Sequence, residues 1–278
     1  MGRADDLTAT LRRSDHDRYL STLYAPDAKR TALVALYSFN AEIAAVRDRV
    51  REPMAGQVRL KWWSDATADL SGNAAAGNPL AEALAGAIVA NRLPVAAFER
   101  MLEARVFDLY DDPMPSRTDL EGYLGETAST LIQLAALILD RDAAQSIAEQ
   151  AGHAGCAQGI AGLLRLMPMH RARGQCYVPA EILTAAGADR ESFLAGETGV
   201  GDRVVEAMVS LGREHWLAFE RGAADMAPSL RPAFLPAALA PAYLDAVARA
   251  GGKALERPVD IAFWRRQWIM LRRASSGF

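Results

Sequence analysis

Residues 157–179 read AQGIAGLLRLMPMHRARGQCYVP and carry the clearest structural signal in the chain. The pattern predicts a helix over about 143–166 that ends before Pro168, because proline disfavours helix at the residue that precedes it. Similar helical spacing, with prolines at helix starts, recurs along the chain, and no alternating run is long enough to propose a strand. The sequence therefore predicts an all-α fold.

The same stretch resembles the second metal-binding motif of the squalene/phytoene synthase family, which reads approximately ALxxTNILRDxxxDxxxGRxYLP. In that family two aspartates four residues apart bind the metal that holds a prenyl diphosphate. The family's two aspartate positions fall here on Leu166 and His170. The surrounding frame is kept at Ala157, Leu163, Leu164, Arg165, Gly174, Tyr177 and Pro179.

Residues 29–48, KRTALVALYSFNAEIAAVRD, resemble the family's first acidic motif, KRxAxxALYAFxRxxDDxxDE. Positions four apart lie on one face of a helix, and the family's two carboxylates fall here on Ala44 and Asp48. Three of the four motif aspartates are therefore absent. Because Arg47 and Arg49 flank Asp48, we expect an ion-paired or solvated Asp48 rather than a metal ligand.

The combination resembles a degenerate branch of the family that includes the mitochondrial complex I assembly factor with a squalene/phytoene synthase domain. This resemblance rests on four segments of the sequence: FNAEIAAVRD, AQGIAGLLRLMPMH, YVPAEIL, and FLP followed by Tyr243 and Leu244. The resemblance implies one domain over residues 1–278, an isoprenoid synthase-like helical bundle around a central cavity. It also implies assistance in assembly of respiratory NADH:ubiquinone oxidoreductase (complex I), with complex I subunits or assembly intermediates as partners.

Family chemistry needs magnesium, which prefers hard oxygen ligands. Alanine and leucine offer none, and His170 offers a nitrogen better suited to zinc, copper or iron. We therefore predict a noncatalytic protein with no catalytic residue, no metal site and no cofactor. Two alternatives stay open: a prenyl transferase that condenses two prenyl diphosphates and uses magnesium, and a noncatalytic protein that binds a prenyl lipid.

The family frame also indicates candidate ligand contacts. Arginine suits phosphate recognition, so Arg165 and Arg173, with Tyr177, are candidates for phosphate or ligand contacts. The alternative for Arg165 is a structural role in which it ties neighbouring helix ends together. Candidate cavity residues are Tyr37, Trp62 and Trp63, although we expect at least one of the tryptophans to lie in the core.

Composition limits the other function classes. With 51% hydrophobic residues, 23% charged residues and a net charge of −3, the chain resembles a soluble globular protein and gives no reason to expect nucleic acid as a partner. Cys156 and Cys176 fit neither a CxxC pair nor a zinc site, and we expect reduced thiols. The predicted location is the cytoplasm, with peripheral contact at the inner face of the cytoplasmic membrane.

Residues 253–278 form a predicted basic amphipathic helical segment with six basic and two acidic residues, a local charge of +4. Basic helices that contain tryptophan can lie on an anionic membrane surface. Docking on the helical bundle is the alternative. The candidate membrane contacts are Trp264, Arg265, Arg266, Trp268, Arg272 and Arg273.

Several helix limits are predicted from caps and prolines. A first long helix should run from Pro26 to about Val50, and others should begin at Pro53, at Asn78 and Pro79, and at Pro94. Thr118 and Glu121 have capping-box spacing, and their helix should continue to about residue 139. Later helices are expected over about 201–222, 232–250 and 259–273.

Overall fold

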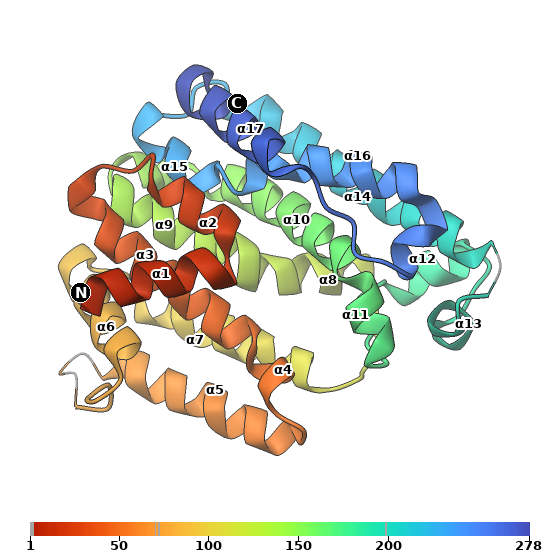
Figure 1. The fold of residues 1–278 in the computed structure, drawn as a ribbon, viewed down its shortest axis with the longest axis horizontal. Helices are drawn as coiled ribbons and strands as arrows, with labels where there is room; N and C mark the ends of the chain where they lie inside the picture. Colours follow the sequence, from red (N-terminus) through yellow and green to blue (C-terminus); the bar gives the residue numbers. More distant parts are fainter. Residues whose placement is uncertain (1–2, 70, 72, 198) are drawn as a thin grey trace. The chain divides into compact units, whose positions relative to one another are not determined.

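The structure, a computed structural model, describes residues 3–69, 71, 73–197 and 199–278 (Figure 1). Within these ranges the chain forms helices and no strand, which confirms the predicted all-α class. Its residues group into two compact units. Unit 1 comprises Met1–Tyr110, Thr130–Ala148 and Met226–Leu235, and unit 2 comprises Asp111–Ser129, Glu149–Asp225 and Pro236–Phe278.

Unit 1 is built around helix α3, which packs against α1, α6 and α9. Phe39 of α3 is fully buried and meets Trp63 and Phe98 edge to face, with ring centroids 5.2 and 5.6 Å apart. Such aromatic pairs add to the burial of apolar area. The helices of unit 1 are α1 (Arg3–Ser14), α2 (His16–Thr22), α3 (Asp27–Ala44), α4 (Val46–Arg49), α5 (Pro53–Ala68), α6 (Pro79–Asn91), α7 (Val95–Arg105), α9 (Thr130–Leu139) and α15 (Arg231–Phe234).

The proline and asparagine signals mark the starts of four helices of unit 1, α3, α5, α6 and α7. Pro26 and Pro94 stand at the N-caps of α3 and α7, and Pro53 lies in the first turn of α5. Asn78 caps α6, because its side chain accepts hydrogen bonds from the backbone N–H groups of Leu80 and Ala81. These starts confirm the predictions, since proline costs no hydrogen bond in the first turn of a helix.

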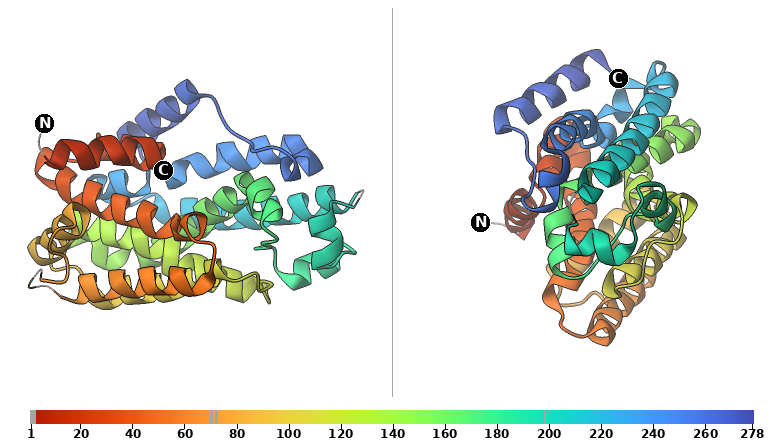
Figure 2. Two further views of the ribbon diagram at one scale, coloured as in Figure 1. Left: turned by 60° about the horizontal axis from the view of Figure 1, so that its bottom comes forward. Right: turned by 90° about the vertical axis from the view of Figure 1, so that its right-hand side faces the viewer.

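Unit 2 is built on the long helix α14, which lies beside α16 (Figures 1 and 2). A Cβ atom on Gly212 of α14 would stand 3.0 Å from Leu244 of α16 and 3.2 Å from Ile160 of α10, so the glycine permits close packing. The helices of unit 2 are α8 (Arg117–Leu124), α10 (Ala148–Arg165), α11 (Met167–Ala172), α12 (Ala180–Ala185), α13 (Arg190–Ala195), α14 (Val200–Ala223), α16 (Ala240–Ala250) and α17 (Phe263–Ser276).

The predicted capping box at Thr118 is wrong. The N-cap of α8 is Ser116, whose hydroxyl accepts a hydrogen bond from the backbone N–H of Asp119 at 3.2 Å. The helix continues beyond α8 as predicted, through a π-helical turn at Gly125–Ser129 into α9. Glu121 is therefore available to a different set of partners.

Two further predicted limits need correction. The helix expected over 143–166 begins only at Ala148, after a 3₁₀ turn at Ala143–Ser146, and it ends at Arg165, before Pro168, as predicted. The helix expected over 232–250 is divided into α15, a 3₁₀ turn at Ala237–Leu239, and α16. Proline is tolerated in a first turn but breaks a helix interior, and Pro236 stands between α15 and the 3₁₀ turn.

In the part of the chain that the structure describes, one stretch is long and apolar enough to cross a membrane, Arg117–Leu139. Its most apolar window has a mean hydropathy of 1.2, and 61% of that window is buried inside the protein. A buried core helix passes the same test of length and composition. The burial is what a core helix shows.

Candidate functional site

The first motif segment lies in unit 1, where α3 ends at Ala44 instead of continuing to Val50. Ala45 has φ −87° and ψ 1°, and α4 begins after it with Asp48 in its single turn. Ala44 and Asp48 are both exposed. The prediction that they share one face of a continuous helix is therefore wrong, because the backbone leaves the helical conformation between them.

Glu42 is the half-buried acid of this segment, and the sequence analysis passed over it. Its carboxylate lies 2.5 Å from a guanidinium nitrogen of Arg49 and 3.6 Å from one of Arg59. Two guanidinium groups beside one carboxylate offset its attraction for a metal ion. The sequence does contain a signal for these ion pairs, because arginines are frequent around the motif.

The three candidate cavity residues of unit 1 have different surroundings. Trp63 is 2% exposed and packs in the core, which confirms the expectation for at least one tryptophan, whereas Trp62 is 38% exposed. Tyr37 is buried, and burial raises the pKa of its phenol to about 12 despite a hydrogen bond with Ser21. Tyr37 is thus a packed, neutral group, and the lining of a cavity by these residues stays a prediction.

The second motif segment lies in unit 2, at the junction of α10 and α11. The carbonyl of Leu166 accepts a hydrogen bond from the backbone N–H of His170 at 3.0 Å, which keeps these positions one helical turn apart. Leu166 is 43% exposed, and His170 is half-buried with its ring 4.8 Å from the ring of Tyr177. Histidine at this place packs on an aromatic side chain, and leucine presents hydrocarbon.

Arg165 makes structural contacts of the kind that the alternative interpretation describes. Its guanidinium lies 3.8 Å from the ring centroid of Tyr243 and 3.4 Å from both the Val259 carbonyl and a carboxylate oxygen of Asp260. These contacts join the end of α10 to α16 and to the segment before α17. Arg173 is exposed, and its role in phosphate binding stays a prediction.

A polar network around the buried His215 in unit 2 could not be predicted from the sequence. His215 of α14 is 7% exposed at its side chain, and its Nε2 lies 3.0 Å from a carboxylate oxygen of Glu121. Its Nδ1 lies 3.0 Å from Nδ1 of His153 on α10. Arg117 binds the same Glu121 at 2.6 Å and pairs with Glu214 at 2.7 Å. The network joins α8, α10 and α14.

The protonation states in this network follow from its geometry. A neutral His215 that donates from Nε2 to Glu121 accepts at Nδ1, so His153 donates across the short contact between the rings. Burial lowers the pKa of His215 below its ordinary value of 6.5, against the opposing effect of Glu121. Burial acts to raise the pKa of Glu121, but hydrogen bonds from Arg117 and His215 outweigh it and lower the pKa.

The donor set at the four motif positions does not fit magnesium. Asp48 offers the one carboxylate, Ala44 and Leu166 offer no ligand atom, and His170 offers nitrogen. Across the described residues, no group of three or more histidine, cysteine, aspartate or glutamate side chains is placed to hold a metal ion. Magnesium chemistry of the kind used for diphosphate departure is therefore not supported by these residues.

The two cysteines are buried and unpaired with each other. Burial raises the pKa of the Cys156 thiol to about 12, and it also raises the pKa of Cys176. The thiolate is the nucleophilic form, so both cysteines are held in the unreactive state.

The six candidate membrane residues of α17 divide between two faces. Arg266 and Arg273 are turned to the rest of unit 2, where they pair with Asp260 and Glu220 at 2.6 and 2.7 Å. The other four candidates, Trp264, Arg265, Trp268 and Arg272, do not belong to this ion-paired face. Trp264 and Trp268 are 69% and 61% exposed, and Arg272 is exposed while Arg265 is half-buried.

An all-α chain that keeps the frame of both diphosphate motifs, but only one of their four carboxylates, is a degenerate prenyl synthase-type protein. The squalene/phytoene synthase family model matches residues 11–267, and the chain belongs to that family. Two solved structures show the same fold. A squalene synthase HpnC from Alicyclobacillus acidocaldarius has a TM-score of 0.75 at 21% identity, covering 91% of this chain and 95% of that one. A dehydrosqualene synthase has a TM-score of 0.79 at 18% identity, covering 97% and 94%.

Three relatives that are similar to this chain in sequence are named as assembly factors and not as synthases. "NADH dehydrogenase (ubiquinone) complex I, assembly factor 6" of Mus musculus is 30% identical over 244 residues, which are 86% of this chain and 72% of the relative. The Bos taurus protein of the same name is 30% identical over 243 residues, 86% of this chain and 69% of the relative. The human protein is 32% identical over 185 residues, 66% of this chain and 55% of the relative.

Proposed function

We propose that this protein is a noncatalytic member of the squalene/phytoene synthase family that assists assembly of respiratory complex I. The observation that carries the proposal is the replacement of motif carboxylates by Ala44, Leu166 and His170 in a chain that keeps the family fold. The relatives named as complex I assembly factors support the assembly role.

The energetic cost of the replacement supports the noncatalytic part of the proposal. Bound metal contributes several kcal/mol to a transition state in which charge develops on the leaving group. Each 1.36 kcal/mol corresponds to about tenfold in rate, so losing the metal lowers the rate on the order of a thousandfold or more. Arg49 and Arg59 pair with Glu42, so this carboxylate does not replace the missing aspartate of the first motif segment.

The proposed partners are subunits or assembly intermediates of complex I, at the inner face of the cytoplasmic membrane. The exposed side chains that support a docking function include Met54, Val58 and Trp62, which stand four apart along α5 of unit 1. Residues four apart share one helix face, so they form an apolar stripe. Exposed contiguous apolar surface is typical of sites where proteins associate.

Deletion of the gene in its host tests the assembly role. We expect less fully assembled complex I on native gels and lower NADH:ubiquinone activity, with the isoprenoid content unchanged. Plasmid-borne wild-type protein should restore both measurements, and so should the variant His170→Ala, because a noncatalytic protein does not need that imidazole. Normal complex I together with a missing isoprenoid would show instead that the protein is a prenyl transferase.

A direct enzyme assay tests the alternative that the protein is a prenyl transferase. Purified protein is incubated with farnesyl or geranylgeranyl diphosphate and magnesium, and the release of diphosphate is measured. We expect a rate equal to that of the protein-free control, while a squalene synthase assayed in parallel releases diphosphate.

A further inference from the structure

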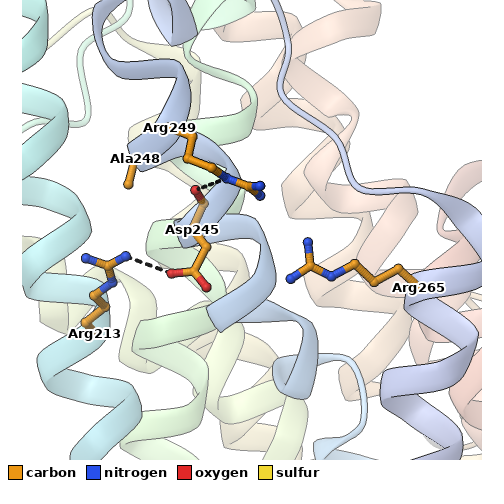
Figure 3. A pocket seen from close by; sticks show the side chains of 5 residues that line it. All are labelled: Arg213, Asp245, Ala248, Arg249 and Arg265. Atoms are coloured by element: carbon orange, nitrogen blue, oxygen red, sulfur yellow. Dashed lines mark hydrogen bonds and ion pairs between the residues drawn. The ribbon is translucent and has the colours of Figure 1, made fainter.

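A basic hollow opens on the surface of unit 2 between α14, α16 and α17 (Figure 3). It has a volume of about 460 Å³ and is lined by Arg213, Asp245, Ala248, Arg249 and Arg265. Three guanidinium groups and one carboxylate give the lining a net charge of 3 − 1 = +2. The volume lies in the range of ligand pockets, roughly 300–1,000 Å³.

The contacts within the hollow leave part of its positive charge unpaired. Arg213 of α14 binds the carboxylate of Asp245 at 2.7 Å, and Nε of Arg249 donates to the Asp245 carbonyl at 3.1 Å. Arg265 extends from α17 toward these groups (Figure 3). Among the described residues, Arg265 makes no ion pair, and Arg249 contacts a neutral carbonyl instead of an acid. The arrangement suits an anion with several oxygen atoms, such as a phosphate group.

The surface of α17 beside the hollow is apolar and aromatic. Trp264, Trp268 and Leu271 follow the spacing i, i+4 and i+7, so they share one face, and they are 69%, 61% and 52% exposed. Arg265 and Arg272 are seven residues apart and form a row next to this face. The opposite face carries Met270, which is fully buried.

We propose that this surface, the basic hollow together with the tryptophan face of α17, binds the headgroup and interface of an anionic phospholipid. The guanidinium groups of Arg249 and Arg265 bind the phosphodiester of the lipid. Trp264 and Trp268 insert into the headgroup region, where tryptophan is favoured. A soluble phosphate would use the hollow but not the exposed rings. The inference does not depend on a role in complex I assembly, and either can fail alone.

Vesicle flotation at low salt tests the site. Wild-type protein should float with vesicles of phosphatidylcholine and phosphatidylglycerol, but not with phosphatidylcholine alone. The double variant Arg249→Gln with Arg265→Gln should bind roughly thirtyfold more weakly, since each basic side chain contributes about 1 kcal/mol and a tenfold change is about 1.4 kcal/mol. The variant Trp264→Ser with Trp268→Ser should also lose binding.

A matched control removes the same charge elsewhere in unit 2. Arg221 of α14 and Arg257 are both exposed, and neither lines the hollow. The variant Arg221→Gln with Arg257→Gln should weaken binding by less than about threefold, because the screened field of a distant charge is small. Circular dichroism and the melting temperature establish that each variant is folded.

Two results would overturn the proposal. Equal losses in the two double variants would show diffuse electrostatic attraction without a site. Absence of wild-type binding to phosphatidylglycerol vesicles would leave an acidic protein surface as the occupant of the hollow. Sodium glycerol phosphate, compared with sodium chloride at the same ionic strength, distinguishes the sources of phosphate. If glycerol phosphate itself shifts the tryptophan fluorescence and vesicles do not, the hollow binds soluble phosphate only, and the proposal fails.

Discussion

Burial favours the neutral form of His215 in unit 2, and the polar groups around this histidine are Glu121, His153, Arg117 and Glu214. If His215 gained a proton at Nδ1, this N–H would face the Nδ1–H of His153 across the 3.0 Å contact between the two atoms. The low exposure of the site removes the water that would otherwise solvate that charge. The network therefore stabilises the packing of α8 and α14 in one protonation state.

We predict that stability falls as the pH is lowered below about 6.5. The pKa of His215 is 6.5 when unfolded and lower when folded, so the unfolded state binds more protons in this window and is favoured by acid. Below about 4.5 the lowered pKa of Glu121 adds to the loss in the same direction. Melting temperatures between pH 5 and 8 should show the slope, and His215→Gln should flatten it. An unchanged slope in that variant would assign the effect to another group.

The loss of metal ligands at Ala44 and Leu166 can be predicted from the amino-acid sequence. The flanking residues that match the family motifs locate these two positions without a structure. The sequence does not allow the partners of Glu121 to be predicted. Ser116 with Asp119 and Thr118 with Glu121 have the same capping-box spacing, and nothing local distinguishes them. In the structure Glu121 pairs with Arg117 and with His215, which is 94 residues away in sequence.

Gly155 and Gly162 of helix α10 have very different surroundings. A Cβ on Gly155 would lie 2.5 Å from backbone atoms of Ser129, in the π-helical turn after α8. A Cβ on Gly162 would meet nothing within 4 Å. The turn thus approaches α10 so closely that only hydrogen fits between the two backbones at Gly155.

Alanine at these two positions should have opposite effects on stability. Gly155→Ala forces the backbones apart, and overpacking of this kind costs about 1–3 kcal/mol. Gly162→Ala should stabilise by about 0.5–1 kcal/mol, since alanine is favoured over glycine in a helix interior. Urea denaturation measures both free energies of unfolding. Equal stabilisation in the two variants would mean that the turn and α10 are farther apart than the structure shows.

Prolines predict the beginnings of the helices better than their ends. Pro53 and Pro94 mark true starts, and Pro168, before which α10 ends as expected, also lies in the first turn of the next helix. The break at Ala45 has no glycine or proline beside it in the sequence from which it could be predicted. For α17 the sequence predicts a basic aromatic helix, but not that Arg266 and Arg273 are the two arginines paired with acids.

At the scale of the whole molecule, the family fold persists without the family's ligands. The core of each unit explains this persistence, because the residues that pack it differ from those that bind metal. Phe39 lies in α3 and is fully buried, whereas Ala44 at the end of the same helix is exposed. Burial of apolar area drives folding, and a surface carboxylate contributes little. Function can therefore change while the fold is kept.

This separation predicts how the whole protein responds to the family's ligands. A ligand at a hundred times its dissociation constant stabilises the fold by about 2.7 kcal/mol. For a protein of this size that corresponds to a rise of roughly 5–10 °C in melting temperature. Because Ala44, Leu166 and His170 supply no oxygen ligand, we expect millimolar magnesium with a prenyl diphosphate analogue to shift the midpoint by less than about 1 °C beyond the analogue alone. A squalene synthase under the same conditions is the positive control. A magnesium-dependent rise of several degrees would show that other oxygen atoms of the chain have replaced the lost carboxylates, and would favour the transferase alternative.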